Sequence, residues 1–227
     1  MKKKTLFNSI CVAIIFTSIL FVAGCKFKDC IKGTEAVITE ERISDPFENI
    51  EARGSSDIHI KKGERFSINI KDHGNLLKYF KTEVKSKTLI LGFDDANCIN
   101  NSEMEVIITM PKLEKIKSLG SGDIDIAGKF AGEKLTTSIL GSGQIIINDS
   151  CSYEKLNASI TGSGDTKAIA GKFENVKIEI LGSGSFVVGE TNSLDIDIKG
   201  SGNVAYYGNP SIKSDVKGSG AINKISK

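Results

Sequence analysis

Apolar and polar residues alternate along most of the chain, and the alternation keeps its phase through a repeated Gly-Ser-Gly triplet. In the stretch VKIEILGSGSFVVG, residues 176–189, the even-numbered positions hold only apolar residues and glycine, whereas most odd-numbered positions are polar. Side chains of a β-strand point alternately to opposite faces, so a period of two is typical of a strand with one buried face. Each copy therefore predicts two strands joined at a bend, with both glycines on the buried side and the serine pointing outward.

The triplet occurs six times, beginning at Gly120, Gly141, Gly162, Gly182, Gly200 and Gly218, at intervals of 21, 21, 20, 18 and 18 residues. A degenerate copy at residues 54–60 has the same alternation. A bend of this kind crowds its inner face and requires unusual backbone angles, and glycine tolerates both. The predicted structural corner glycines are Gly54, Gly120, Gly122, Gly141, Gly143, Gly162, Gly164, Gly182, Gly184, Gly200, Gly202, Gly218 and Gly220.

The length of the repeat indicates how the strand pairs stack. Eighteen residues at about 3.3 Å each describe a circuit of roughly 60 Å, in which about five residues return the chain to the next bend. Successive circuits stack about 4.8 Å apart, and each buries its apolar face only against its neighbours. We therefore predict an all-β fold, a right-handed β-solenoid or β-helix of about seven coils. Helical periodicity is nearly absent, and residues 76–80 are the best helix candidate.

Residues 61–113 depart from the repeat and contain a compact apolar strand at 104–110. We predict an antiparallel β-meander that is inserted after the first coil and caps the N-terminal end, because an uncovered coil exposes unpaired backbone. The predicted organisation is a signal peptide over 1–24, a lipidated N-terminus and tether over 25–45, and the solenoid over 46–227, with the repeats in 114–227.

The first 24 residues have the layout of a secretory signal peptide, with three lysines, an apolar run over 10–23 and small residues before Cys25. The ending VAGC resembles the lipobox of bacterial lipoproteins, which implies that Cys25 is the acylated first residue of the mature chain. The alternative is an uncleaved anchor, since the run is of marginal length for a bilayer. Lys26 stands where an aspartate retains many lipoproteins in the inner membrane, so we expect an outer-membrane protein of the cell envelope, on the periplasmic or surface-exposed face.

Charge and cysteine content argue against several partners. The chain has 30 basic and 28 acidic residues, and loss of residues 1–24 leaves 27 against 28. This balance argues against nucleic acid, whose phosphates require a basic excess. Besides Cys25, the mature chain carries Cys30, Cys98 and Cys151, an odd number without C-x-x-C spacing. We therefore expect no disulfide framework and no metal site, and interpret these three as buried or inert thiols.

The residues around the triplets do not predict a phosphate loop or a calcium ladder. A phosphate loop needs the N-terminus of a following helix, which the repeat lacks. The position after the triplet varies among aspartate, glutamine, serine, asparagine and alanine, so it does not form a row of calcium ligands. An isolated site near Asp123 and Asp125 is the less favoured alternative to a solvated polar face.

Candidate catalytic groups are few. His59 stands two residues from Asp57 on the outward parity, and we interpret the two as a solvated pair rather than a general base and its orienting group. Phe130, Tyr153 and Phe173 recur in the return segments, where an internal stack is favoured over an exposed stripe. No catalytic residue and no cofactor is predicted.

Apolar alternation followed by Gly-Ser-Gly, then Asp, Asn or Gln and an apolar residue, repeated through a lipoprotein-like chain, resembles the putative auto-transporter adhesin, head GIN domain family. The resemblance extends from about Phe47 to Ile222, and the signature at 50–60, the strand at 104–110 and the repeat at 115–126 follow the family's order. It implies a β-solenoid protein of the cell envelope. The family defines no catalytic or binding residues that could be carried over.

These observations favour a non-catalytic lipoprotein whose solenoid serves adhesion, scaffolding or ligand binding, with the membrane as partner through Cys25 and a glycan or protein as ligand. The alternative is a carbohydrate-active β-helix that acts on an extracellular polysaccharide in its return loops. At the C-terminal end, Ile222 continues the buried parity and no cap is apparent. Two interpretations stay open for that coil edge: Lys224 and Lys227 repel a second edge, or copies of the chain form a homo-oligomer there.

Overall fold

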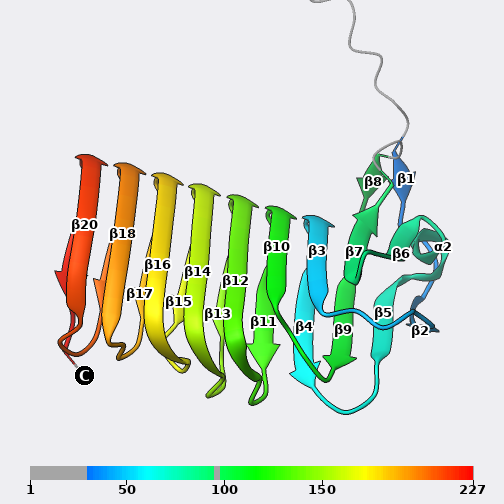
Figure 1. Cartoon of the computed structure of the whole chain (residues 1–227). Helices are drawn as coiled ribbons and strands as arrows, with labels where there is room; N and C mark the ends of the chain where they lie inside the picture. Colours follow the sequence, from blue (N-terminus) through cyan, green and yellow to red (C-terminus); the bar gives the residue numbers. More distant parts are fainter. Residues whose placement is uncertain (1–29, 95–97, 227) are drawn as a thin grey trace, which may run out of the picture. The chain divides into compact units, whose positions relative to one another are not determined.

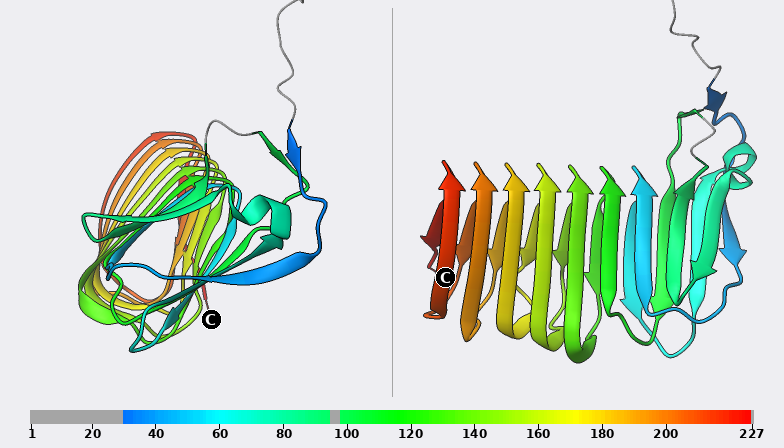
Figure 2. Two further views of the ribbon diagram at one scale, coloured as in Figure 1. Left: turned by 90° about the vertical axis from the view of Figure 1, so that its right-hand side faces the viewer. Right: turned by 45° about the horizontal axis from the view of Figure 1, so that its top comes forward.

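A computed structural model describes residues 30–94 and 98–226, and the part from Ile31 onward forms one compact unit. Two long β-sheets extend through this unit (Figure 1) and face each other when it is viewed along its length (Figure 2). The nine-stranded sheet contains, in spatial order, β20 (Ser211–Gly218), β18 (Ser193–Gly200), β16 (Lys172–Gly182), β14 (Ser152–Gly162), β12 (Ala131–Gly141), β10 (Lys115–Gly120), β3 (Asn49–Gly54), β7 (Thr88–Phe93) and β6 (Phe80–Lys85).

The ten-stranded sheet contains, in spatial order, β2 (Val37–Arg42), β5 (Ser67–His73), β9 (Glu105–Met110), β4 (Asp57–Lys62), β11 (Ile124–Ala127), β13 (Gln144–Ile147), β15 (Asp165–Ala168), β17 (Ser185–Val188), β19 (Asn203–Tyr206) and β21 (Ala221–Lys224). A further small sheet pairs β1 (Ile31–Lys32) with β8 (Ile99–Asn100), and α2 (Gly74–Leu77) is a short helix that overlaps the predicted helix candidate. The prediction of an all-β solenoid is confirmed.

The predicted bend and the predicted stacking are both present. Each bent strand pair contributes one strand to each sheet, and neighbouring coils pair in parallel. The first glycine of each triplet lies opposite the first glycine of the next coil, from Gly54 through Gly120 to Gly218. Seven such pairs occur among the described residues, and the six from β10–β11 onward follow one another directly, which makes about five uninterrupted turns.

The inward parity of the repeat forms the core. In β16, Val176, Ile178 and Ile180 are buried while the residues between them are exposed. Mostly apolar rows run from coil to coil along the axis, one of them through Ile124, Ile145, Thr166 and Phe186. Burial of apolar surface supplies about 25 cal/mol per Å². Only a neighbouring coil can remove these rows from water, so the coils are stable as a stack and not singly.

The two glycines of a triplet are required for different reasons. The first, such as Gly182, is partly exposed rather than buried as predicted, but it has the predicted unusual backbone angle, a φ of 129°, and a Cβ there would collide with the carbonyl oxygen of Gly162 in the preceding coil. The second, such as Gly184, is buried without a positive φ. Its Cβ would meet the carbonyl oxygen of Gly164 and the inward side chain of Ile160, so the predicted crowding of the inner face applies to this glycine. The close approach therefore lies along the stacking axis, where the Ser183 amide donates a 2.9 Å hydrogen bond to the Gly162 carbonyl.

Each corner glycine is constrained by the coil that precedes it and not by the coil that follows it. A Cβ on Gly122 would collide with the carbonyl oxygen of Ser56, so glycine is needed from the second coil onward. Ser56 itself carries a side chain and is 9% exposed, and a Cβ on Gly54 would meet no atom within 4 Å. The first copy of the triplet is degenerate because no equivalent corner stacks against it from the N-terminal side.

The inserted strands cap the N-terminal end, but they are divided between the two sheets and do not form one antiparallel meander. β7 joins β3 in parallel, and β6 continues the nine-stranded sheet by antiparallel pairing. β9 joins β4 in parallel, and β5 and β2 continue the ten-stranded sheet by antiparallel pairing. Phe47, Leu77 and Phe80 are at most 2% exposed and close the core at this end. The division follows because both edges of the first coil need hydrogen-bond partners.

The folded unit begins earlier than the predicted boundary at residue 46. β2 is the outermost strand of the ten-stranded sheet and β1 pairs with β8, so residues 31–42 are structured and not a tether. β2 was not predicted from the sequence. Nearly all its residues are exposed, so apolar and polar residues do not alternate along it as they do in a strand with one buried face. The predicted signal peptide and Cys25 lie outside the described residues. In the described part of the chain, no helix is long and apolar enough to cross a membrane.

The interpretation of the remaining cysteines as three thiols is wrong for two of them. Cys30 and Cys98 are disulfide-bonded, and they directly precede β1 and β8, the two strands that pair with each other. Cys151 is a free thiol that is 1% exposed, and burial raises its pKa to about 11. An odd number of cysteines excludes pairing of all of them but still allows one disulfide. The spacing of Cys30 and Cys98 in the sequence does not indicate that they pair.

Candidate ligand-binding groove

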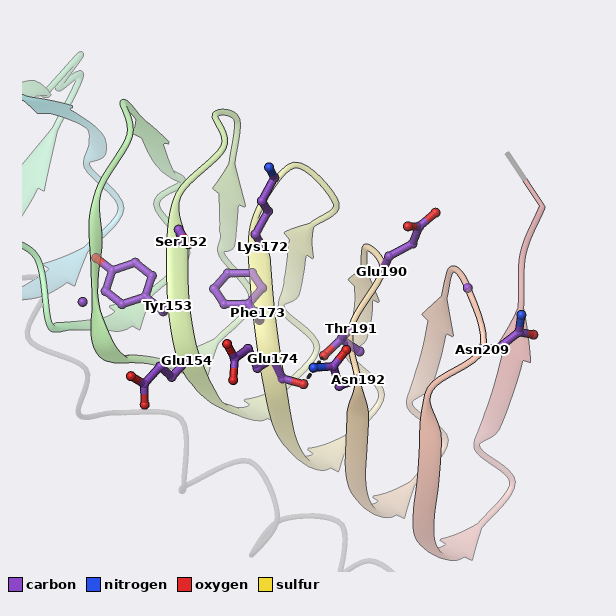
Figure 3. Close-up of a pocket in the computed structure, with 12 residues that line it drawn as sticks. Ser152, Tyr153, Glu154, Lys172, Phe173, Glu174, Glu190, Thr191, Asn192 and Asn209 are labelled. Carbon is purple, nitrogen blue, oxygen red and sulfur yellow. Dashed lines mark hydrogen bonds between the residues drawn. The ribbon is translucent and has the colours of Figure 1, made fainter.

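The return segments of the coils carry a groove made of two adjoining cavities. The first has a volume of about 640 Å³ and lies over the starts of β14 and β16 and the returns that follow β17 and β19 (Figure 3). The second has a volume of about 910 Å³ and lies over the starts of β10, β12 and β14. Gly132 and Tyr153 line both cavities, so the two adjoin at this point.

The first cavity follows from the unequal length of the repeats. β12, β14 and β16 have 11 residues each, whereas β18 and β20 have 8. The extra residues, 131–133, 152–154 and 172–174, form a ledge that ends after β16, because the pairing of β16 with β18 begins only at Asn175. The interval between triplets shortens from 20 to 18 residues at the same place. The cavity lies at the resulting step.

Hydrogen bonds between coils hold the wall of this step. The carbonyl oxygen of Glu174 accepts a 2.9 Å hydrogen bond from Thr191 Oγ1 and a 3.0 Å hydrogen bond from the Asn192 amide (Figure 3). Ser193 Oγ donates to Asn175 Oδ1 at 2.7 Å. These bonds connect the end of the ledge to the shorter coil and support this wall of the cavity.

Buried aromatic rings form the floor of the groove. Tyr153 and Phe173 pair in register, and their rings are stacked with centroids 6.4 Å and planes 13° apart. Both, like Phe130, are at most 4% exposed, which confirms the predicted internal position of all three, but only Tyr153 and Phe173 stack on each other. Tyr153 Oη donates a 2.7 Å hydrogen bond to the Leu113 carbonyl, and burial raises the pKa of this phenol. The register partner of Tyr153 on its other side is Gly132, which contributes no side chain, and the cavities join there.

The two cavities differ in charge. The first is lined by Glu154, Glu174 and Glu190 and one lysine, Lys172. In Figure 3 the carboxylates of Glu154 and Glu174 lie on one side of the rings, and Lys172 and Glu190 lie on the other. The second is lined by four lysines and two glutamates, namely Lys112, Lys115, Lys134, Lys155, Glu114 and Glu133. The groove is therefore acidic toward β18 and basic toward β10.

Some charges of the basic half are already paired. Lys112 Nζ lies 2.5 Å from Glu114 Oε1, and this hydrogen bond raises the pKa of the lysine. Lys155 Nζ lies 3.8 Å from Glu133 Oε1, a looser pair between exposed side chains. A polar, two-signed lining over a closed aromatic floor suits a hydroxyl-rich or charged ligand better than an apolar one.

His59 does not form the predicted pair with Asp57. Its Nδ1 lies 3.2 Å from Asp125 Oδ2 and its Nε2 lies 3.7 Å from Glu105 Oε1, both on neighbouring strands of the ten-stranded sheet. Lys71 Nζ also contacts Glu105 at 2.9 Å. The adjoining cavity of about 310 Å³ is lined by no serine, threonine or cysteine. The cluster links adjacent strands and offers no hydroxyl or thiol nucleophile.

The aspartates near the triplets bind backbone of the next coil. Asp57 Oδ1 accepts a hydrogen bond from the Asp123 amide at 3.1 Å, Asp123 Oδ1 from Gln144 at 3.0 Å, and Asp165 Oδ1 from Ser185 at 2.9 Å. The variable position after the triplet is thus a site of coil-to-coil bonding wherever it is an aspartate. Within residues 30–94 and 98–226, no group of three or more His, Cys, Asp or Glu side chains could hold a metal ion.

The internal position of Tyr153 and Phe173 was predicted from the sequence, but the groove above them and its rim were not. Two features of the sequence could have indicated the groove. The repeat shortens after Phe173, and in the following coil the position equivalent to Phe173 holds Thr191 instead of an aromatic residue. The corner glycines, which the sequence did identify, are brought into lines at the bend and do not line the groove.

The family model for the putative auto-transporter adhesin, head GIN domain, matches residues 46–152 and 146–210. The chain belongs to this family. Its match covers the first coil, the inserted strands and all but the last coil of the head GIN domain, including most of the groove. No curated protein matches the chain.

Solved structures share the fold of this head GIN domain protein at low sequence identity. A putative adhesin from Bacteroides fragilis is 22% identical with a TM-score of 0.71, covering 86% of this chain and 100% of that one. A putative adhesin from Parabacteroides distasonis is 16% identical with a TM-score of 0.67, covering 87% and 100%. A putative lipid binding protein from the same species is 21% identical with a TM-score of 0.62, covering 87% and 100%.

Proposed function

We propose that this protein is a non-catalytic adhesion module of the cell envelope, anchored by a lipid on Cys25, which binds a polar glycan or a charged protein segment in the groove of its return segments. Membership of an adhesin family and the solenoid fold support an adhesion or scaffold role. The observation that carries the proposal is the groove itself, whose two halves have opposite charge.

The lack of a histidine or cysteine in the described part of the groove supports binding over catalysis by a serine or cysteine nucleophile. Among the described residues, the groove contains carboxylates and lysines but no histidine or cysteine. Its aromatic rings are buried, and Tyr153 is hydrogen-bonded, so they shape the floor and leave contact with a ligand to the charged and amide side chains of the rim. Weak contacts distributed over a preformed polar surface are typical of glycan and surface recognition.

One observation favours a second candidate, a carbohydrate-active β-helix. Three glutamates, Glu154, Glu174 and Glu190, line the first cavity, and glycoside hydrolysis uses a pair of carboxyl groups. One experiment distinguishes the two functions. The chain from residue 26 onward is screened against acidic polysaccharides and host glycans while the release of reducing or unsaturated ends is followed. Binding without release supports the adhesion module, and release of new ends supports the enzyme.

A matched pair of variants locates the binding. Gly132→Arg places a long side chain where the cavities join, on an exposed residue whose Cβ would lie 3.2 Å from the Tyr153 ring. Leu140→Arg introduces the same side chain at an exposed position of the same strand that lines neither cavity. We expect Gly132→Arg to abolish binding of a ligand that the unchanged chain retains, and Leu140→Arg to preserve it. Equal binding by both variants would place the ligand elsewhere.

The anchor has its own test. If Cys25 is acylated after cleavage, Cys25→Ser yields a protein that no longer partitions into detergent when the cells are fractionated. A Cys25→Ser protein that still fractionates with membranes would mean that the apolar segment is an uncleaved anchor. This result would leave the groove and its ligand unaffected, so the two parts of the proposal are tested separately.

A further inference from the structure

Within the described residues, β20 and β21 are the outermost strands of the two sheets at the last coil. In the described residues, β20 pairs only with β18 and β21 only with β19. Ile212 and Val216 of β20 are each 39% exposed, although they stand in register with Leu194 and Ile198, which are at most 1% exposed. The inward row of the solenoid therefore ends on two apolar side chains that lack the neighbour every other coil provides.

We propose that this edge pairs with the same edge of a second copy of the chain, with β20 antiparallel to β20 and centred on Ser214. The inward residues of β20 have even numbers and the outward residues have odd numbers. An antiparallel pairing centred on Ser214 places even-numbered residues opposite even-numbered ones, so inward residues of the two copies face each other. It places Ile212 opposite Val216 of the second copy on the inner face, and Lys213 opposite Asp215 of the second copy on the outer face.

Both contacts occur twice, because the pairing is symmetric. Directly opposed side chains on antiparallel strands have Cβ atoms about 4.5–5.5 Å apart, close enough for an apolar contact or an ion pair. The sequence of β20 is thus complementary to itself in charge and in hydrophobicity. Asp215 at present contacts Lys217 at 3.0 Å, and both side chains are more than half exposed, so this pair can exchange for the intermolecular one.

The symmetry of the contact closes the assembly as a dimer. The opposite end of the solenoid does not present the same edge, because β7 and β9 cover the first coil and the outermost strands there are β6 and β2. An isologous contact through one surface gives a closed pair and not a fibre. Lys224, one of the two lysines expected to repel a second edge, donates a 2.6 Å hydrogen bond to Asn209 Oδ1 of its own chain, and Lys227 lies outside the described residues.

Such a dimer carries two grooves. If the groove binds a ligand as proposed above, two linked sites raise the apparent affinity for a surface that presents many copies of it. The pairing itself does not depend on that function, because it involves only β20 and β21. Self-association and ligand binding can therefore succeed or fail independently.

Charge exchange at two positions tests the pairing. The chain from residue 26 onward keeps the whole described core, and its mass is measured by light scattering and sedimentation over a range of concentrations. We expect a monomer–dimer equilibrium. Lys213→Asp places two aspartates opposite each other, and Asp215→Lys two lysines, so each should raise the dissociation constant at least about tenfold. The double variant Lys213→Asp/Asp215→Lys restores opposite charges and should restore the dimer.

A matched control lies one coil away. Asp195 is an exposed outward residue of β18 in register with Lys213, and Asp195→Lys changes charge without touching the facing residues of the second copy. This variant should still form dimers, and circular dichroism should show all variants folded. A single-chain mass at every concentration overturns the proposal. So does a dimer that both single variants leave intact, or that the double variant does not restore.

Discussion

The carbonyl oxygen of Gly162 occupies the space that a side chain on Gly182 would need. The two glycines are opposite each other in neighbouring coils, and the amide of Ser183 donates its hydrogen bond to the same oxygen. The distance between coils at the bend is therefore set by contact of backbone with backbone. The outward serine side chain takes no part in this contact.

Substitution at this corner should separate the role of the glycine from that of the serine. Gly182→Val combines a positive φ of 129° with the collision against Gly162, and we expect it to reduce the free energy of unfolding by about 3 kcal/mol or more. Ser183→Ala removes an exposed hydroxyl and should cost less than about 1 kcal/mol. Chemical denaturation of both variants measures the difference. Equal losses would mean that the serine ladder is structural.

A second comparison distinguishes strain within the backbone from collision between coils. Gly54 and Gly120 both have a positive φ, 91° and 151°, but only Gly120 has a carbonyl oxygen where a Cβ would be. Gly54→Ala should cost about 1–2 kcal/mol for the backbone conformation alone. Gly120→Ala should cost clearly more in the same denaturation assay. A larger loss at Gly54 would contradict a close approach along the stacking axis.

The disulfide and the buried thiol together predict how many thiols of the chain from residue 26 onward react with a thiol reagent. Cys151 is buried and its pKa is raised to about 11, so the native protein should not react with a thiol reagent at neutral pH. Unfolding without a reductant should expose one thiol, and unfolding with a reductant should expose three, because Cys30 and Cys98 are disulfide-bonded. Three reactive thiols without reductant would show that the disulfide does not form.

Glu51 should contribute stability that depends on pH. Burial acts to raise the pKa of its carboxyl group, but hydrogen bonds from Arg53, at 2.6 Å, and Lys117, at 3.2 Å, lower it below the ordinary value of 4.5. Because the pKa is depressed in the folded state, the stabilisation is present above about pH 4.5 and is lost as the pH falls through the folded-state value.

The test compares Glu51→Gln with the unchanged chain by urea denaturation. At pH 7 the variant should be less stable by about 1 kcal/mol, since it keeps the shape of the side chain but loses two charge-assisted contacts. Toward pH 3 the two proteins should converge. As a control, Glu83→Gln removes an exposed carboxylate paired only with Lys85 at 2.9 Å and should have little effect at either pH. A Glu51→Gln deficit that persists at pH 3 would exclude the electrostatic account.

The sequence by itself determined the solenoid, because the alternation through VKIEILGSGSFVVG is a local property that settles which side of each strand is buried. It also identified the bend, the glycines at it and the internal position of Tyr153 and Phe173. It did not identify β2, since an edge strand with exposed residues has no buried parity to detect. Nor could it show why each glycine is needed, because the colliding atom belongs to the preceding coil.

Only the tertiary structure decided which residues of different coils meet. His59 contacts Asp125 and Glu105 rather than its sequence neighbour Asp57, because the parallel register places strands distant in sequence side by side. The groove likewise arises from a difference between coils, the ledge that ends after β16, and no single repeat contains it. Periodicity is encoded within one strand, whereas contacts across the stack depend on the relative placement of several. For that reason the fold was readable from the chain, and the candidate site was not.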